Sequence, residues 1–122
     1  MKLDFKKMNG LIPAVVQDNV SKRVLMIGFM NEDAYAKTLS DGFVTFWSRG
    51  RNCLWQKGEN SGNKLKVIAI KSDCDSDSLL IMAEPFGPTC HTGNDSCFEY
   101  DFSVGDLFKL LSDRKNKMPD NS

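Results

Sequence analysis

The sequence has no surplus of charge of either sign, no long apolar run and only one histidine. Sixteen Lys and Arg residues balance sixteen Asp and Glu residues, which argues against a dedicated nucleic-acid binder, because affinity for polyanions depends on a basic surplus. The longest apolar run, Val24–Met30, is far shorter than the ~20 residues that span a bilayer. The N-terminal lysines precede no apolar segment, so no signal peptide is predicted. We therefore expect a cytoplasmic protein with no membrane or nucleic-acid partner.

The rest of the composition is that of an ordinary globular domain. The 122 residues suit a single domain, and 41% of them are apolar, which is enough to form a core. The four cysteines are Cys53, Cys74, Cys90 and Cys97. In a reducing compartment, cysteines of this kind indicate metal binding or catalysis rather than disulfides.

The apolar pattern predicts an α+β fold, a mainly antiparallel sheet with one or two short helices. A helix is expected to begin after the capping residue Asn31 and to end at Gly42, and Val104–Arg114 has helical spacing. Strands are expected at Leu11–Gln17, Lys22–Met30, Phe43–Trp47, Cys53–Lys57, Leu65–Lys71, Leu79–Glu84 and Phe98–Phe102.

The segment Asp73-Cys74-Asp75-Ser76-Asp77 is the sharpest local feature. In an extended chain, alternate residues point the same way, so the three aspartates would share one face and Cys74 would point to the other. Carboxylates suit a hard ion such as Mg²⁺, whereas a thiolate suits a softer one. A solvated polar turn is the alternative. A calcium loop is disfavoured, because Ser78 stands where that loop needs Gly and Pro85 blocks an exiting helix.

Cys90 and Cys97 lie in a polar loop and complete a set of three thiols with Cys74. Three protein ligands leave a tetrahedral zinc ion one open position for water, as in catalytic zinc sites. His91 adjoins Cys90 and is either a fourth ligand of a closed structural site or a general acid/base beside an open one. Cys53 is predicted to be a packing residue outside the site.

A third segment combines both tryptophans with three cations, in Trp47-Ser48-Arg49-Gly50-Arg51 and Trp55-Gln56-Lys57-Gly58-Glu59. Arginine forks match phosphate oxygens, and indole faces stack on bases, so this pattern indicates a site for a phosphorylated nucleotide. The alternative is a β-hairpin whose tryptophans pack into the core while its cations are solvated.

Taken together, these motifs resemble the phosphoribosyl-AMP cyclohydrolase family of histidine biosynthesis. The resemblance runs from about Gly10 to Phe98 and consists of several long motifs in order. They are Met30-Asn31-Glu32, Trp47-Ser48-Arg49, Leu54-Trp55-Gln56-Lys57-Gly58-Glu59-Asn60-Ser61-Gly62, Asp73-Cys74-Asp75-Ser76-Asp77, and Gly87-Pro88-Thr89-Cys90-His91-Thr92-Gly93 followed by Cys97. Two positions depart from the pattern: Gly50 stands where the family often has Ser, and Cys53 is an unexpected thiol.

The resemblance implies zinc-dependent hydrolysis of the adenine ring of phosphoribosyl-AMP, at the bond between ring positions 1 and 6. It implies an entwined homodimer in which zinc ligands come from both protomers. Proton handling is assigned to His91, with Glu59 as an alternative base. The implied zinc ligands are Cys74, Cys90 and Cys97; the implied magnesium ligands are Asp73, Asp75 and Asp77; the substrate-binding candidates are Trp47, Ser48, Arg49, Arg51, Lys57 and Glu59.

The chain is expected to divide into a cyclohydrolase domain, residues 1–103, and a C-terminal helical segment, residues 104–122. That segment resembles the opening helix of a phosphoribosyl-ATP pyrophosphohydrolase domain, which suggests a truncated bifunctional protein; a short terminal helix is the alternative. Two other functions remain open. A zinc nucleobase deaminase shares water attack on a purine carbon, but its His-x-Glu and Pro-Cys-x-x-Cys pattern is missing. A non-catalytic zinc module that binds a nucleotide is the second.

Overall fold

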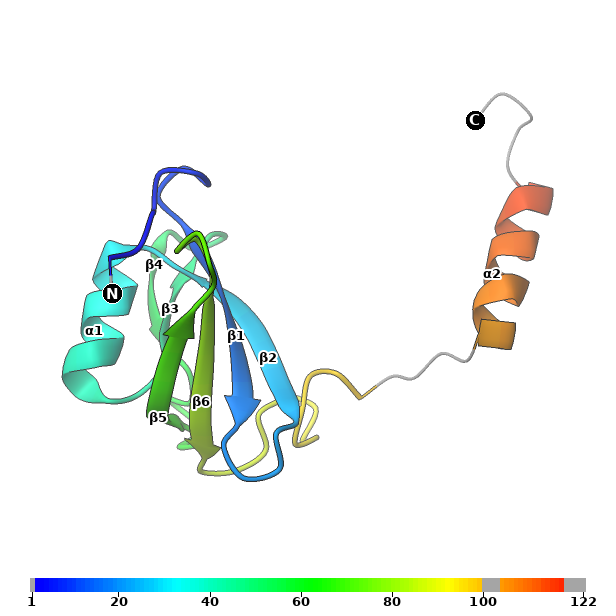
Figure 1. Cartoon of the computed structure of the whole chain (residues 1–122). Helices are drawn as coiled ribbons and strands as arrows, with labels where there is room; N and C mark the ends of the chain where they lie inside the picture. Colours follow the sequence, from blue (N-terminus) through cyan, green and yellow to red (C-terminus); the bar gives the residue numbers. More distant parts are fainter. Residues whose placement is uncertain (1, 100–103, 118–122) are drawn as a thin grey trace.

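Six strands and two helices make up the part of the chain that this computed structural model describes, residues 2–99 and 104–117 (Figure 1). The elements are β1 (Ile12–Asp18), β2 (Val24–Met30), α1 (Glu32–Asp41), β3 (Thr45–Ser48), β4 (Cys53–Gln56), β5 (Leu65–Ser72), β6 (Leu79–Pro85) and α2 (Val104–Lys117). The α+β class and these elements confirm the predictions to within a few residues. The strand predicted at Phe98–Phe102 is not formed at residues 98 and 99, and residues 100–103 lie outside the described part.

The strands form two sheets. The larger has the order β2-β1-β6-β5, and β3 pairs with β4 in a separate hairpin. Three of the pairings are antiparallel, β1 with β2, β5 with β6 and β3 with β4, in agreement with the predicted mainly antiparallel sheet. The fourth, between β1 and β6, is parallel and was not predicted. This pairing joins strands far apart in the chain, so no local sequence pattern predicts it.

The core lies between the larger sheet and a layer made of α1 and the β3–β4 hairpin (Figure 1). Alternate residues of β1 are fully buried, and Phe46 of β3 packs with them. The Asn31 side chain accepts a hydrogen bond from the Ala34 amide and caps α1, as predicted. Gly42 ends the helix with φ +78°, a left-handed conformation that favours glycine. These caps position β3, which begins three residues later.

Gly28 of β2 allows the hairpin to approach the larger sheet closely. A Cβ atom at this position would lie 2.5 Å from the Phe46 ring, a distance that real Cβ atoms do not adopt. The Phe46 ring also lies 5.7 Å from the ring of Trp55 on β4. Gly28 therefore lets an aromatic layer form beside β2, at the base of the cavity described below.

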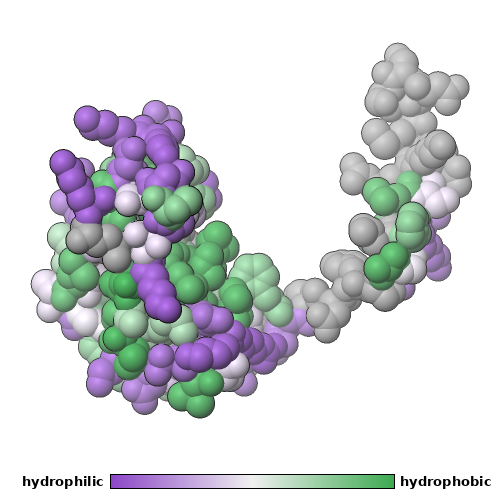
Figure 2. Space-filling view, in the orientation of Figure 1, coloured by the Kyte–Doolittle hydropathy of each residue, from purple (hydrophilic) through white to green (hydrophobic). Residues whose placement is uncertain are grey.

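The outer face of the larger sheet, which points away from the core, is also apolar. Its strand register pairs Val15 with Ile27 on one side and with Leu80 on the other. Ile27 is 49% exposed, and Val15 and Leu80 are half-buried. Figure 2 shows apolar side chains gathered over the sheet in this view, with hydrophilic side chains above and below them. Within the described residues, neither helix is long and apolar enough to cross a membrane.

Candidate functional site

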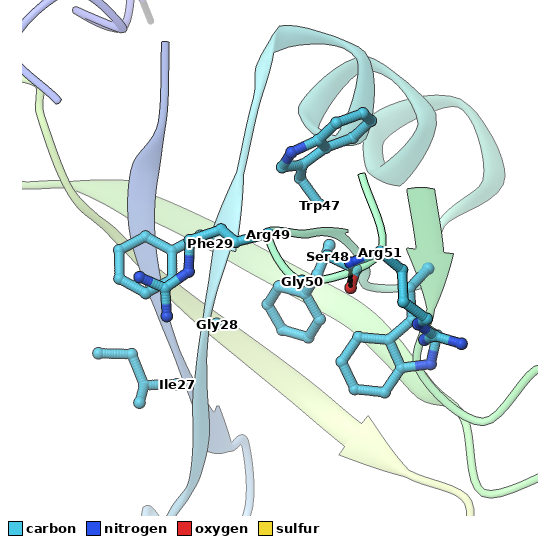
Figure 3. A pocket seen from close by; sticks show the side chains of 10 residues that line it. Ile27, Gly28, Phe29, Trp47, Ser48, Arg49, Gly50 and Arg51 are labelled. Carbon is cyan, nitrogen blue, oxygen red and sulfur yellow. Dashed lines mark hydrogen bonds between the residues drawn. The ribbon is translucent and has the colours of Figure 1, made fainter. Parts of the chain in front are cut away.

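A cavity of about 540 Å³ opens between β2 and the β3–β4 hairpin. Its lining is aromatic and basic: Ile27, Gly28, Phe29, Phe46, Trp47, Ser48, Arg49, Gly50, Arg51 and Trp55 (Figure 3). Four of the residues predicted to bind substrate therefore line a single cavity, namely Trp47, Ser48, Arg49 and Arg51. We call this cavity the aromatic–basic pocket. Trp47 and Trp55 line the pocket and also pack against the core, as the alternative prediction for the tryptophans expected.

Arg49 is held in place by an aromatic ring. Its guanidinium carbon lies 4.0 Å from the centroid of Phe29, within the range of a cation–π interaction (Figure 3). Phe29 was not singled out in the sequence, since an isolated phenylalanine in an apolar strand is normally a packing residue. The Phe29 ring therefore orients the Arg49 guanidinium in the pocket and leaves its positive charge available for a ligand.

Lys57 and Glu59, the other two predicted substrate-binding residues, do not line the aromatic–basic pocket. The Lys57 ammonium lies 5.7 Å from the centroid of the Trp55 ring. Its positive charge is a minor influence at both thiols: it adds to the lowering of the pKa of Cys90, which the Thr92 hydroxyl dominates, and it opposes the raising of the pKa of Cys97, which desolvation dominates. Lys57 therefore lies between the pocket and these two thiols, whereas Glu59 is exposed in the turn that follows β4.

The residues Asp73–Asp77 form the turn between β5 and β6, which we call the acidic turn. The prediction of an extended chain was wrong here, because Ser76 has φ +61° and the segment bends back on itself. The carboxylates converge all the same, with one oxygen from each lying within 4.8 Å of the others. The strands on both sides also exclude the helix–loop–helix of a calcium loop.

Asp73 holds the acidic turn together. Its carboxylate accepts hydrogen bonds from the Ser78 hydroxyl at 2.6 Å and from the Asp77 amide at 3.0 Å. These bonds, the Ser78 hydroxyl above all, hold the pKa of Asp73 far below its usual value. The neighbouring Asp73 and then Asp75 raise the pKa of Asp77. The turn therefore concentrates negative charge, which a cation would relieve.

A cation of the chain itself already lies on the acidic turn. The Lys7 ammonium is 3.0 Å from Asp75 Oδ2 and 3.2 Å from Asp77 Oδ2. The Asp4 amide donates to the Ser76 carbonyl at 2.7 Å, so the N-terminal segment is tied to the turn by its backbone as well. These contacts join parts of the chain 68 and 70 residues apart, and no local pattern in the sequence signals them.

Cys90 and Cys97 lie at the two ends of a loop that follows β6, residues 89–97, which we call the thiol loop. The Cys90 amide donates to the Asn94 carbonyl at 3.0 Å, and the Gly93 amide donates to the Cys90 carbonyl at 2.9 Å. The loop thus folds back on itself and brings the two thiols near enough for each to shift the pKa of the other. Two of the three predicted zinc ligands are neighbours, as the prediction requires.

The two thiols of this loop differ in electrostatics. A hydrogen bond from the Thr92 hydroxyl, 3.1 Å from Cys90 Sγ, lowers the pKa of Cys90. Desolvation by surrounding groups, followed by the nearby Cys90, raises the pKa of Cys97 even though the residue as a whole is exposed. Of the pair, Cys90 is the readier to become a thiolate and to bind a metal.

Cys74 lies at the opposite end of the sheet from the thiol loop. It belongs to the acidic turn before β6, whereas Cys90 follows β6, and that strand of seven residues is about 20 Å long (Figure 1). Across residues 2–99 and 104–117, the three carboxylates form a cluster of metal-binding type, and the three cysteines do not. A single chain does not bring the predicted zinc ligands together.

His91 and Cys53 are both accessible. His91 is exposed in the turn that joins Cys90 to Gly93, next to the thiol pair. Cys53, predicted as a packing residue, is exposed at the start of β4. That prediction was wrong because the apolar neighbours Leu54 and Trp55 suggested a buried strand, whereas β4 pairs with β3 alone and leaves its first residues open to solvent.

The sequence profile described as phosphoribosyl-AMP cyclohydrolase matches residues 26–99. The histidine biosynthesis bifunctional protein HisIE of Bacteroides thetaiotaomicron is 54% identical, over 100% of this chain and 63% of that protein. The proteins of the same name from Buchnera aphidicola and Escherichia coli are 55% and 49% identical, over 100% and 99% of this chain and 59% and 62% of their own lengths.

The chain thus spans about three fifths of the length of these relatives. The matched residues 26–99 include the tryptophans and arginines of the aromatic–basic pocket, the whole acidic turn and the whole thiol loop. The match covers more than half of the sequence, and the relatives are about half identical to it over essentially its full length. The chain belongs to the phosphoribosyl-AMP cyclohydrolase family.

Proposed function

We propose that this protein hydrolyses the adenine ring of phosphoribosyl-AMP, at the bond between ring positions 1 and 6, in histidine biosynthesis. The observation that carries this proposal is the family match, because residues 26–99 enclose all three candidate sites. A deaminase has no such support. A non-catalytic zinc module that binds a nucleotide would also use a pocket lined by two arginines and two tryptophans, so measurement of turnover separates the two functions.

The aromatic–basic pocket has the chemistry that the substrate needs. Arg49 and Arg51 provide guanidinium forks for phosphate oxygens, and the faces of Trp47 and Trp55 suit a flat heterocycle. The Phe29 ring holds the Arg49 guanidinium from below at 4.0 Å. Lys57 influences the electrostatics of both thiols, so its charge would act near the thiol loop rather than with the two arginines.

The thiol loop fits a zinc ion by its chemistry. Cys90 and Cys97 are adjacent soft donors, and the hydrogen bond from Thr92 favours the thiolate of Cys90. Cys74, the third donor, is at the far end of β6 in the same chain. A zinc site with all three donors therefore takes Cys74 from one protomer and the thiol loop from its partner.

The outer face of the larger sheet supports such a homodimer. It exposes Ile27 and leaves Val15 and Leu80 half-buried, which is unusual for a face that only meets water. A second cavity of about 410 Å³ joins this face to the acidic turn, since its lining includes Val15, Leu80 and Asp73. A second copy seated on this face would lie beside the turn that carries Cys74.

The acidic turn fits a hard cation such as Mg²⁺. Its three carboxylates offer oxygen donors within 4.8 Å of one another, and the Lys7 ammonium already lies on two of them. Asp73, Asp75 and Asp77 would hold the ion, which would help to bind a phosphate group or ribose oxygens of the substrate.

In the reaction, water adds to carbon 6, the bond from that carbon to ring nitrogen 1 breaks, and the nitrogen takes up a proton. A zinc ion bound at the thiols would supply Lewis acidity, which lowers the pKa of water. His91, exposed beside Cys90, would take the proton of the attacking water or deliver one to the departing nitrogen. Such help contributes roughly 10²–10⁴-fold to rate. Glu59, exposed after β4, is the alternative base.

The C-terminal segment has its own proposal. The helix predicted at Val104–Arg114 is confirmed as α2, and Val104, Phe108 and Leu111 are exposed along it. We propose that α2 opens a second helical unit like the pyrophosphohydrolase domain to which it was likened. Expressing the chain with and without residues 104–122 tests the division between residues 1–103 and this segment. The cyclohydrolase activity should persist without the segment, and a loss of activity would contradict the division.

The test of the proposed function is turnover of phosphoribosyl-AMP, followed by the absorbance of the opened product, before and after chelation and return of zinc. The proposal predicts turnover that chelation abolishes and zinc restores. Absence of turnover in protein that carries its full complement of zinc would contradict it and favour the non-catalytic module.

A further inference from the structure

Ser96 is a fully buried polar residue in the otherwise exposed end of the thiol loop. Its side chain is inaccessible to solvent, and its hydroxyl donates to the Val24 carbonyl at 2.7 Å. The same oxygen accepts from the Phe98 amide at 2.9 Å. A buried hydroxyl that both donates and accepts a hydrogen bond fixes the chain on either side of it, because breaking either bond leaves a buried polar group unpaired.

A salt bridge supports Ser96 from outside. Arg23 Nη2 lies 2.6 Å from Glu99 Oε1, and that same carboxylate oxygen accepts from the Ser96 amide at 3.2 Å. The Cys97 amide donates to the Leu25 carbonyl at 2.8 Å. The residues on both sides of Cys97 are therefore tied to β2 and to Arg23 just before it. We call Ser96, Arg23 and Glu99 the edge clamp.

The clamp uses a free strand edge. β2 is the outermost strand of the larger sheet, so the Val24 and Leu25 carbonyls on its open side have no neighbouring strand. By contrast, Cys90 is held by bonds inside the thiol loop itself, to Asn94 and Gly93. The position of Cys97 relative to Cys90 thus depends on bonds that reach about 70 residues back along the chain.

We propose that the edge clamp is a positioning unit that holds the Cys97 thiol opposite Cys90 and thereby sets how tightly the thiol loop retains zinc. The inference rests on the proposed zinc site and assigns no contact with substrate to Ser96, Arg23 or Glu99. Residues that orient a metal ligand in this indirect way change metal affinity by about 10–100-fold when they are removed. We expect Ser96→Ala to weaken zinc binding within that range.

The experiment measures the zinc dissociation constant of the full chain by competition with a chromophoric chelator, at one protein concentration for all variants. Ser96→Ala is compared with Ser40→Ala, which removes an exposed hydroxyl from α1. Arg23→Met is compared with Arg23→Lys, which keeps the charge for Glu99. The inference predicts weaker zinc binding in Ser96→Ala and Arg23→Met, wild-type affinity in Ser40→Ala and recovery in Arg23→Lys.

Cobalt substitution gives a second readout that general destabilisation does not move. Each thiolate bound to Co²⁺ adds charge-transfer absorbance, so loss of Cys97 from the shell removes about a third of it per cobalt in a site of three thiolates. The inference predicts that Arg23→Met loses this part of the cobalt absorbance, although its circular dichroism spectrum stays the same as that of the wild type. If Ser96→Ala does not fold, Arg23→Met still tests the inference, because the Arg23 side chain is partly exposed and its replacement should leave the fold intact.

Unchanged zinc affinity and unchanged cobalt absorbance in Arg23→Met and in folded Ser96→Ala would overturn the edge clamp alone. If Cys97→Ser binds zinc as tightly as the wild type, the proposed zinc site fails, and the clamp fails with it. The two failures are therefore distinguishable.

Discussion

The acidic turn and the thiol loop lie at opposite ends of β6, and both carry residue types that bind metals, but the chain brings these residues together differently. The donors of the acidic turn come from five consecutive residues, and one chain brings them within 4.8 Å of one another. The thiol loop supplies only two thiols, and its third predicted partner lies at the other end of the strand. A site with contiguous donors is complete in the protomer, whereas the proposed zinc site, with dispersed donors, would depend on a second copy.

The two regions also differ in the charge that faces them. Lys7 lies on the acidic turn at 3.0 and 3.2 Å, and these contacts raise its pKa. At the thiol loop, the charge of Lys57 is a minor influence, behind the hydrogen bond from Thr92 that lowers the pKa of Cys90 and the desolvation that raises the pKa of Cys97. One site is thus partly neutralised by its own chain, and the other relies on the electrostatics of its thiols. The predictions below separate the two sites.

The largest effect is expected from removing one thiol. Cys97→Ser should abolish zinc retention and reduce turnover to background, a greater loss than the roughly 10–100-fold that removal of a supporting residue causes. Asp75→Asn should weaken Mg²⁺ binding and leave the zinc content unchanged. Metal analysis of the two purified variants measures both. Loss of zinc from Asp75→Asn would show that the two sites are not separate.

His91 tests whether the thiol loop is an open or a closed site. His91→Ala should keep its zinc and lose about 10²–10⁴-fold in turnover, because it removes proton transfer and leaves the thiols in place. Zinc content and kcat of the same preparation give the answer. A variant that loses zinc would make His91 a fourth ligand and the site a closed structural one.

A smaller effect is expected at the acidic turn. Lys7→Met should tighten the binding of Mg²⁺, or of Mn²⁺ as a spectroscopic probe, by about three- to fivefold, because it removes one exposed competing charge. Lys6→Met is the matched control, since it removes the same charge one residue earlier. Equal affinity in the two variants would show that the Lys7 contact does not compete with the ion.

The smallest effect is expected at Cys53, which belongs to neither site. Because Cys53 is exposed at the start of β4, Cys53→Ser should change the free energy of unfolding by no more than about 0.5 kcal/mol. Urea denaturation measures the change. A loss of several times this size would restore the interpretation of Cys53 as a packing residue.

Features encoded by neighbouring residues could be predicted from the sequence. Asn31 and Gly42 mark the ends of α1, and the apolar pattern predicted the strands that pair antiparallel to within a few residues. The same holds for the acidic turn, whose donors are adjacent in the chain, although its bend at Ser76 was missed.

Features that depend on distant residues could not be predicted. The parallel pairing of β1 with β6, the contact of Lys7 with the acidic turn and the bond from Ser96 to Val24 all join remote segments. Each is decided by how the strands assemble, for which a single sequence carries no local signal. For the same reason, Lys57 was grouped with Arg49 and Arg51, although it lies toward the thiols.

The central claim, that zinc is held by donors from two protomers, is tested most directly by complementation. Cys74→Ala and Cys97→Ala are each expected to be inactive, and the two are co-expressed at equal levels with the same tag, so that dimers of every pairing are purified. Sharing predicts that about a quarter of the wild-type activity returns, because about half of randomly paired dimers are mixed and each holds one intact site of two. Inactive mixed dimers would contradict a zinc site shared between protomers.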